Sequence, residues 1–167
     1  SSSPVASGDT LSVNAGRILS DTGAAEVVGT GTISGSGILR FTDTSGGPGT
    51  TISTISLPTR YDASNGNIAS TTVDARTYTN QITFLSTSTT ARTITLGAGT
   101  FILSGATSHW YVIANGASPG DLTVTGATNN PTVTIGGDLD FTGTGSSSES
   151  LTTGSGTWTV SGDANFG

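Results

Sequence analysis

Two aspartates separated by one residue are the clearest candidates for chemistry in this chain. Asp138 and Asp140 flank Leu139, and in a strand such residues point to the same face. With Leu139 and Phe141 facing inward, this face is expected to meet solvent, where paired carboxylates can bind Ca²⁺ or act as acid and base. A solubilising acidic edge gives the same pattern, because one D-x-D without further ligands is a weak motif. We expect no cofactor, and Asp138 and Asp140 are the candidates for a metal site.

A second group of polar and aromatic residues lies in one segment of the chain. Its members are Tyr61, Asp74, Arg76 and Tyr78. Loops on a rigid scaffold often carry binding sites, and aromatic faces beside a carboxylate and an Arg could hold a sugar. The alternative is an ion pair between Asp74 and Arg76 that holds an irregular loop in place. These four residues are candidate contacts to a ligand or partner.

Trp110 is the fifth candidate contact. In the run from Trp110 to Ile113, alternate residues share a face. If Ile113 points inward, Trp110 points outward, where it could meet a neighbouring subunit or a glycan. Packing beneath the 58–80 loop is the alternative for this side chain.

The remaining motifs do not support catalysis. His109 is the only histidine, and a serine nucleophile needs a base held beside it, so a serine hydrolase site is not indicated. We expect His109 at a corner or strand edge. The paired glycines never extend to a dinucleotide fingerprint, and a Walker motif needs a Lys that this chain lacks. We therefore expect that the protein is not an enzyme.

The elements that position these residues follow from recurring apolar clusters. Two series of apolar residues repeat with a period of about 20 residues, a length typical of proteins in which each unit stacks on the next. The first series is Leu11, Ile33, Ile52, Val73, Ile94, Ile113, Val133 and Leu151. The second series lies about half a repeat away: Leu19, Leu39, Leu57, Ile82, Phe101, Leu122, Leu139 and Trp158.

This pattern predicts an all-β parallel β-solenoid, or β-helix, of about eight coils. Thr, Val and Ile are abundant and favour strands, while glycines are placed to turn the corners. The alternative is an antiparallel β-sandwich or jelly roll. The predicted core is Leu11, Ile33, Leu39, Phe41, Ile52, Ile94, Phe101, Leu103, Leu122, Val124, Val133, Ile135, Leu139, Phe141, Trp158 and Val160.

The whole chain, 1–167, is expected to be a single solenoid domain, as part of a longer chain. Residues 58–80 break the rhythm with Pro58 and the Asn65-Gly66-Asn67 turn, so we expect an irregular loop or insertion there. Residues 97–105 resemble 154–162, and we interpret the interval between the two copies as three coils.

Composition restricts the partners and the location. The net charge is −6, which argues against a nucleic-acid partner. No apolar stretch is long enough for a membrane span, so we expect no membrane insertion. The chain has no Cys and few charged residues, which fits an extracellular or cell-surface protein.

The sequence also resembles a family of surface proteins. Gly97-Ala98-Gly99-Thr100-Phe101-Ile102-Leu103-Ser104-Gly105 and its copy from Gly154 to Gly162 resemble the passenger repeats of autotransporter-like and other large repetitive bacterial cell-surface proteins. This resemblance implies a parallel β-helix on the outside of a cell. We expect a non-enzymatic structural protein, a subunit or segment of a surface fibre, stalk or layer that self-associates into a filament through β-strand edges. The alternatives are an adhesin passenger domain that binds surface glycans, and a polysaccharide-active β-helix enzyme.

Overall fold

The structure, a computed structural model, describes residues 3–21, 27–42, 52, 54–69, 73–116, 118–144 and 147–167. Every regular element in these ranges is a β-strand. None of the described segments forms a helix that could cross a membrane. All strand pairs are parallel, so the predicted parallel β-solenoid is confirmed.

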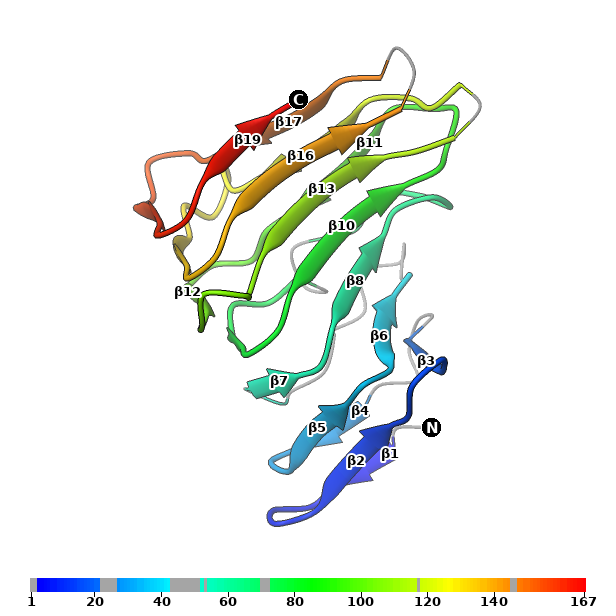
Figure 1. Ribbon diagram of the computed structural model, residues 1–167, viewed down its shortest axis with the longest axis vertical. Coiled ribbons are helices and arrows are strands. Elements are labelled where there is room, and N and C mark those ends of the chain that lie inside the picture. The colour runs from blue at the N-terminus through cyan, green and yellow to red at the C-terminus, as the bar shows by residue number, and fades with distance from the viewer. Residues whose placement is uncertain are drawn as a thin grey trace.

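Two seven-stranded sheets form most of the wall (Figure 1). Sheet I contains β2 (Thr10–Val13), β5 (Thr32–Gly35), β7 (Thr54–Ser56), β9 (Thr77–Tyr78), β12 (Thr100–Leu103), β15 (Thr132–Ile135) and β18 (Trp158–Val160). Sheet II contains β3 (Ile18–Asp21), β6 (Ile38–Phe41), β8 (Thr59–Asp62), β10 (Ile82–Ser86), β13 (Trp110–Ala114), β16 (Leu139–Gly143) and β19 (Ala164–Phe166).

A third, shorter face closes the solenoid. It contains β11 (Arg92–Thr95), β14 (Leu122–Thr125) and β17 (Glu149–Thr152), and Ile68 bridges to Ile94 of β11. Nearer the N-terminus, β4 (Val27–Gly29) pairs with β1 (Ser3–Val5). The chain passes through sheet I, sheet II and this third face in each turn, and the described residues give about five turns with all three faces.

The predicted number of eight coils is therefore wrong. In sheet I, Leu11 lies beside Ile33, whereas Leu103 lies beside Ile135, which is a longer step along the chain. Longer corners lengthen the later turns. Residues taken at a constant spacing of about 20 along the sequence therefore lie on one face in the early turns and on another face in the later turns. The two similar glycine-flanked segments are separated by two turns rather than three coils, because Phe101 pairs with Val133 and Val133 pairs with Trp158.

The expected loop at 58–80 is largely part of the wall. Thr59–Asp62 forms β8, which pairs with β6 on one side and β10 on the other. Thr77–Tyr78 forms β9, between β7 and β12. Ile68 and Val73 are buried in the core. The turn residues that suggested an insertion mark the corner after β8, where a turn closes from Gly66 N–H to the carbonyl of Ala63 at 3.1 Å.

The core runs along the inside of the stack. Thirteen predicted core residues are buried: Ile33, Leu39, Phe41, Ile52, Ile94, Phe101, Leu103, Leu122, Val124, Val133, Ile135, Leu139 and Phe141. The other three, Leu11, Trp158 and Val160, are partly buried and pack against this cluster because they belong to the first and last strands of sheet I.

An aromatic ladder along sheet II forms a large part of the core, and the sequence analysis placed only its first member, Phe41, there. Phe41, Tyr61, Phe84 and Trp110 come from four successive strands, and their neighbouring ring centroids are 5.0, 5.4 and 4.7 Å apart. Parallel in-register pairing places equivalent inward side chains one above the other, about 4.8 Å apart, so large rings stack along the axis. Each ring has less than 2% of its surface exposed.

Candidate functional site

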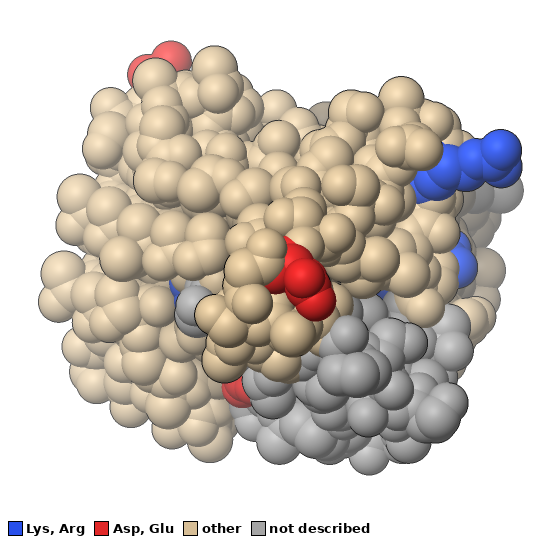
Figure 2. Space-filling view, turned by 90° about the horizontal axis from the view of Figure 1, so that it is seen from below, with Lys and Arg blue, Asp and Glu red and all other residues tan. Residues whose placement is uncertain are grey.

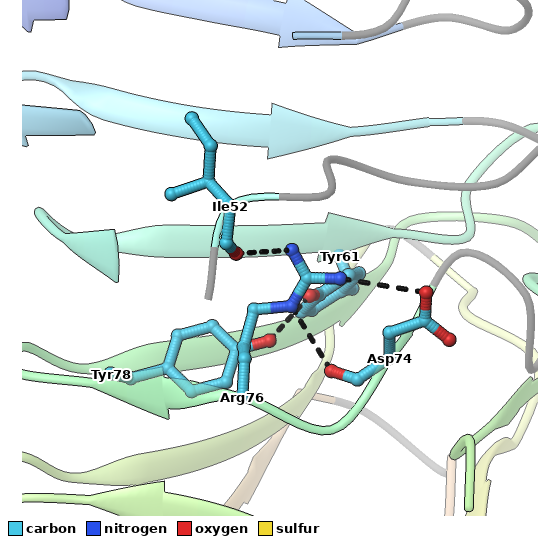
Figure 3. A network of polar contacts seen from close by, with 5 residues as sticks. All are labelled: Ile52, Tyr61, Asp74, Arg76 and Tyr78. Carbon is cyan, nitrogen blue, oxygen red and sulfur yellow. Dashed lines mark hydrogen bonds and ion pairs between the residues drawn. The ribbon is translucent and has the colours of Figure 1, made fainter. Parts of the chain in front are cut away.

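Two of the predicted contact residues form a hydrogen-bonded pair inside the solenoid. Tyr61 of β8 and Tyr78 of β9 face each other across the core, and their hydroxyl oxygens are 2.6 Å apart (Figure 3). Both side chains are fully buried, so neither can meet a ligand at the outer surface. Burial raises the pKa of Tyr61 and raises that of Tyr78 well above its usual value, because a phenolate would be charged in an apolar medium.

Arg76 and Asp74 form the ion pair expected between them. Arg76 is only 6% exposed. Its Nε donates to the carbonyl of Asp74 at 3.1 Å, its Nη1 donates to the carbonyl of Ile52 at 3.3 Å, and its Nη2 lies 3.7 Å from the Asp74 carboxylate (Figure 3). Partial burial raises the pKa of Asp74, although the Arg76 charge opposes this effect. The network ties the segment preceding β9 to the neighbouring turn. Asp74 and Arg76 thus have a structural role in holding these segments together.

Trp110 also lies in the core. In β13 its side chain and those of Val112 and Ala114 are buried, while Tyr111 and Ile113 alternate with them and are half-buried. The indole packs against Phe84 and meets the Trp158 ring at 5.5 Å. Ile113 therefore points outward, and the expectation of an exposed Trp110 is wrong. The run has apolar residues on both faces, so the sequence alone leaves the choice of face open.

The outer face of sheet II instead gathers His109, Asp138 and Asp140. His109 immediately precedes β13, and Asp138 immediately precedes the adjacent β16, which contains Asp140. The Nδ1 atom of His109 lies 3.2 Å from Oδ2 of Asp138 and accepts the backbone N–H of Asp138 at 3.1 Å. Metal-ligating atoms of the three residues all lie within 4.8 Å of one another, and each residue is half-buried. Among the described residues, these are the ones that could hold a metal ion.

Neighbouring groups fix the two carboxylates. Oδ1 of Asp138 accepts the backbone N–H of Asp163 at 2.8 Å, and Oδ1 of Asp140 accepts Nδ2 of Asn165 at 2.6 Å. Tyr111 pairs in register with Asp140. Partial burial raises the pKa of Tyr111, and the charges of Asp140 and Asp138 raise it further. Negative charge is thus concentrated on this part of the outer face.

Sequence reasoning found Asp138 and Asp140 but did not connect them to His109. The signal that could have connected them is the number of residues in one turn of the solenoid. His109 and Asp138 are separated along the chain by the same interval as Trp110 and Leu139, which pair in register. Asp74 does not join this group, since it precedes β9 of sheet I, two turns earlier.

The last described turn carries a second distinctive feature. Glu149 of β17 pairs in register with Leu122, a fully buried core residue. Its Oε1 accepts the backbone N–H of Ala114 at 3.0 Å. A cavity of about 280 Å³ opens beside it, lined by Phe141, Thr142, Gly143, Ser147, Glu149 and Gly167. An inward-pointing charge in a terminal strand limits indiscriminate pairing on that face.

No protein family, curated protein or solved structure matches this chain. Inferences about its function therefore depend on its own residues and geometry.

Proposed function

We propose that this chain is a non-enzymatic structural protein: a subunit or segment of an extracellular surface fibre, stalk or layer. In this proposal the solenoid is a rigid spacer, and sheets I and II continue through their terminal strands into further parallel strands. The observation that carries the proposal is the combination of open sheet edges with incompletely buried apolar side chains in the same strands. The low charge content, the absence of Cys and the resemblance to surface-protein repeats support an extracellular location.

The backbone of the last strand of sheet II has groups available for pairing. Leu139 N–H donates to the carbonyl of Asp163 at 2.9 Å. In a parallel ladder, successive residues direct their peptide groups to opposite sides. Because Asp163 faces β16, the N–H and carbonyl of Ala164 and of Phe166 face the open edge. An unpaired edge of this kind is a template for another strand.

Side chains beside these edges are apolar and only partly covered. Phe166 stacks on Phe141 at 4.9 Å but keeps 70% of its surface exposed, and Trp158 and Val160 are half-buried. At the opposite end, Leu11 of β2 and Leu19 of β3 pack against the core but are only partly buried. Figure 2 views the molecule from that N-terminal end and shows charged side chains that are few and scattered among the described residues. Another turn stacked on either end would cover these groups, as each inner turn is covered by its neighbours.

The adhesin and enzyme alternatives draw less support from the geometry. The aromatic residues assigned to a glycan contact, Tyr61, Tyr78 and Trp110, lie in the core. A polysaccharide-cleaving site built on Asp74 together with Asp138 would need both on one face, yet Asp74 leads into sheet I and Asp138 into sheet II.

Sedimentation velocity of the protein over a wide concentration range tests the proposal. We expect the weight-average sedimentation coefficient to rise with concentration. Ala164→Pro removes an edge-facing N–H without removing a hydrogen bond to β16, and should keep the protein monomeric. Ala106→Pro is the matched control, because Ala106 is exposed and follows Gly105 in a turn closed by Ser108 N–H at 3.1 Å, where proline is favoured.

Circular dichroism of both variants establishes that they remain folded. A wild-type protein that sediments as a monomer at every concentration contradicts assembly through these edges. Equal association of wild type and Ala164→Pro also contradicts it, because the assembly would then use another surface.

A further inference from the structure

We propose that His109, Asp138 and Asp140 form a binding site for a divalent transition-metal ion of the zinc class. The site uses one imidazole nitrogen and two carboxylate oxygens, with water completing the coordination. This proposal is independent of the structural role suggested above, because the three residues lie on the outer wall rather than at a strand edge.

The fold itself brings the three ligands together. His109 and Asp138 occupy equivalent positions in adjacent strands, one residue before the paired Trp110 and Leu139. Parallel pairing therefore holds their backbones at strand-to-strand distance, about 4.8 Å. Asp140 lies two residues beyond Asp138 and points to the same outer face, as the alternate burial of Leu139 and Phe141 requires. No loop rearrangement is needed to assemble this set.

The spacing of the first two ligands suits one small ion. His109 Nδ1 and Asp138 Oδ2 are 3.2 Å apart. If an ion lay about 2.1 Å from each atom, the angle from Nδ1 through the ion to Oδ2 would be roughly 100°. This angle falls between those of octahedral and tetrahedral coordination. The Asp140 carboxylate, within 4.8 Å of the other ligand atoms, is close enough to complete the set by side-chain rotation.

The imidazole presents a lone pair to this position. Because the backbone N–H of Asp138 donates to Nδ1, that nitrogen acts as an acceptor, which is the form that binds metals. Oδ2 of Asp138 lies 3.2 Å from the same nitrogen, so a proton or a metal ion shared between the two atoms would stabilise this contact. A bound ion would take the Nδ1 lone pair in place of the Asp138 N–H and would neutralise this contact.

Groups outside the ligand set orient the carboxylates. Asp163 N–H holds Oδ1 of Asp138, and Asn165 holds Oδ1 of Asp140. Each carboxylate therefore retains its second oxygen for an ion, and outer partners of this kind strengthen metal binding. Within the described part of the chain, neither aspartate forms an ion pair with an Arg. The half-buried ligands also leave room for water and for entry of the ion.

The ligand chemistry favours zinc over calcium. Ca²⁺ prefers six to eight oxygen ligands, whereas an imidazole nitrogen with carboxylates suits zinc and its neighbours. The Ca²⁺ site considered for Asp138 and Asp140 from the sequence is thus replaced by a site that depends on His109.

Proton NMR of the untagged, chelator-treated protein gives a direct test, because the chain contains one histidine and no cysteine. All imidazole ring signals therefore come from His109. We expect ZnCl₂ to shift or broaden these signals with saturation at one equivalent, and EDTA to restore them. CaCl₂ should leave them unchanged. Ring signals unaffected by Zn²⁺ would overturn the proposal, as would a shift that fails to saturate.

Variants measured by zinc titration calorimetry identify the other ligands. Asp138→Asn and Asp140→Asn should each weaken zinc binding by about tenfold or more. Asp9→Asn, at an exposed aspartate far along the chain, removes the same charge and should leave the affinity unchanged. Equal weakening by all three variants would indicate attraction by net charge alone and would also overturn the assignment. Circular dichroism checks that each variant is folded.

Discussion

The buried tyrosine pair allows a quantitative test of how the core is held together. Tyr61 and Tyr78 are fully buried, and their hydroxyl groups are 2.6 Å apart. Replacing either tyrosine with phenylalanine removes one hydroxyl and leaves the other buried without its partner. An unsatisfied buried polar group costs about 1–3 kcal/mol, so each single variant should lose about that much unfolding free energy.

The double variant should behave differently from the sum of the two singles. Tyr61→Phe combined with Tyr78→Phe removes both hydroxyls and leaves no unpaired group, and paired replacement by apolar groups can be nearly neutral. We expect the double variant to cost no more than one single variant, which gives a coupling energy of about 1–3 kcal/mol. Tyr111→Phe is the matched control, because Tyr111 is the third tyrosine and faces outward. It should change stability by less than about 0.5 kcal/mol.

Guanidinium denaturation followed by tryptophan fluorescence provides the assay. Trp110 lies at the end of the aromatic ladder and Trp158 in the last strand of sheet I, so the two indoles report on the C-terminal part of the stack. Strictly additive losses would refute the reasoning, since they would mean that the two hydroxyls do not act as a pair. Single variants as stable as wild type would refute it too, because the hydroxyls would then have access to water.

Three further predictions concern the core and the close stacking of adjacent turns. The raised pKa values of Tyr61 and Tyr78 mean that the folded state retains phenolic protons longer than the unfolded chain, so the contribution of these two tyrosines to stability should be constant below about pH 10 and fall above it. The double phenylalanine variant should therefore show a shallower loss in alkaline denaturation curves, and an unchanged slope would contradict this. Phe84→Ala, in the middle of the ladder, should cost about 3–5 kcal/mol by guanidinium denaturation, whereas a loss below about 1 kcal/mol would mean that the rings do not stack. Gly156→Ala should lower the melting temperature by several degrees, because a Cβ there would collide with the backbone carbonyl of Pro131 in the adjacent turn, and an unchanged melting temperature would argue against this close approach.

The fold class was predictable because apolar pairs separated by turns recur through the whole chain. The turn number was not, because the corners differ in length. Ile94 and Ile113, which a constant step places in one column, lie on β11 and β13 of different faces. A period reveals stacking, but only the register shows which residues are neighbours.

The candidate sites show the same limit. From the sequence, Tyr61, Tyr78 and Trp110 are candidates for surface contacts as well as for packing, because amphipathic aromatic residues suit both interfaces and cores. In the structure, all three side chains point inward and are buried in the core. His109 carries no local motif, and its place beside Asp138 arises from one complete turn of the solenoid.

Electron microscopy of the purified protein tests the central claim most directly, namely that the open sheet edges extend the solenoid. Seven strand levels at about 4.8 Å predict rods or filaments that lengthen in steps of about 34 Å. Ala164→Pro should give isolated particles at the same concentration. Isolated wild-type particles at every concentration, or filaments equally abundant with Ala164→Pro, would contradict assembly through these edges.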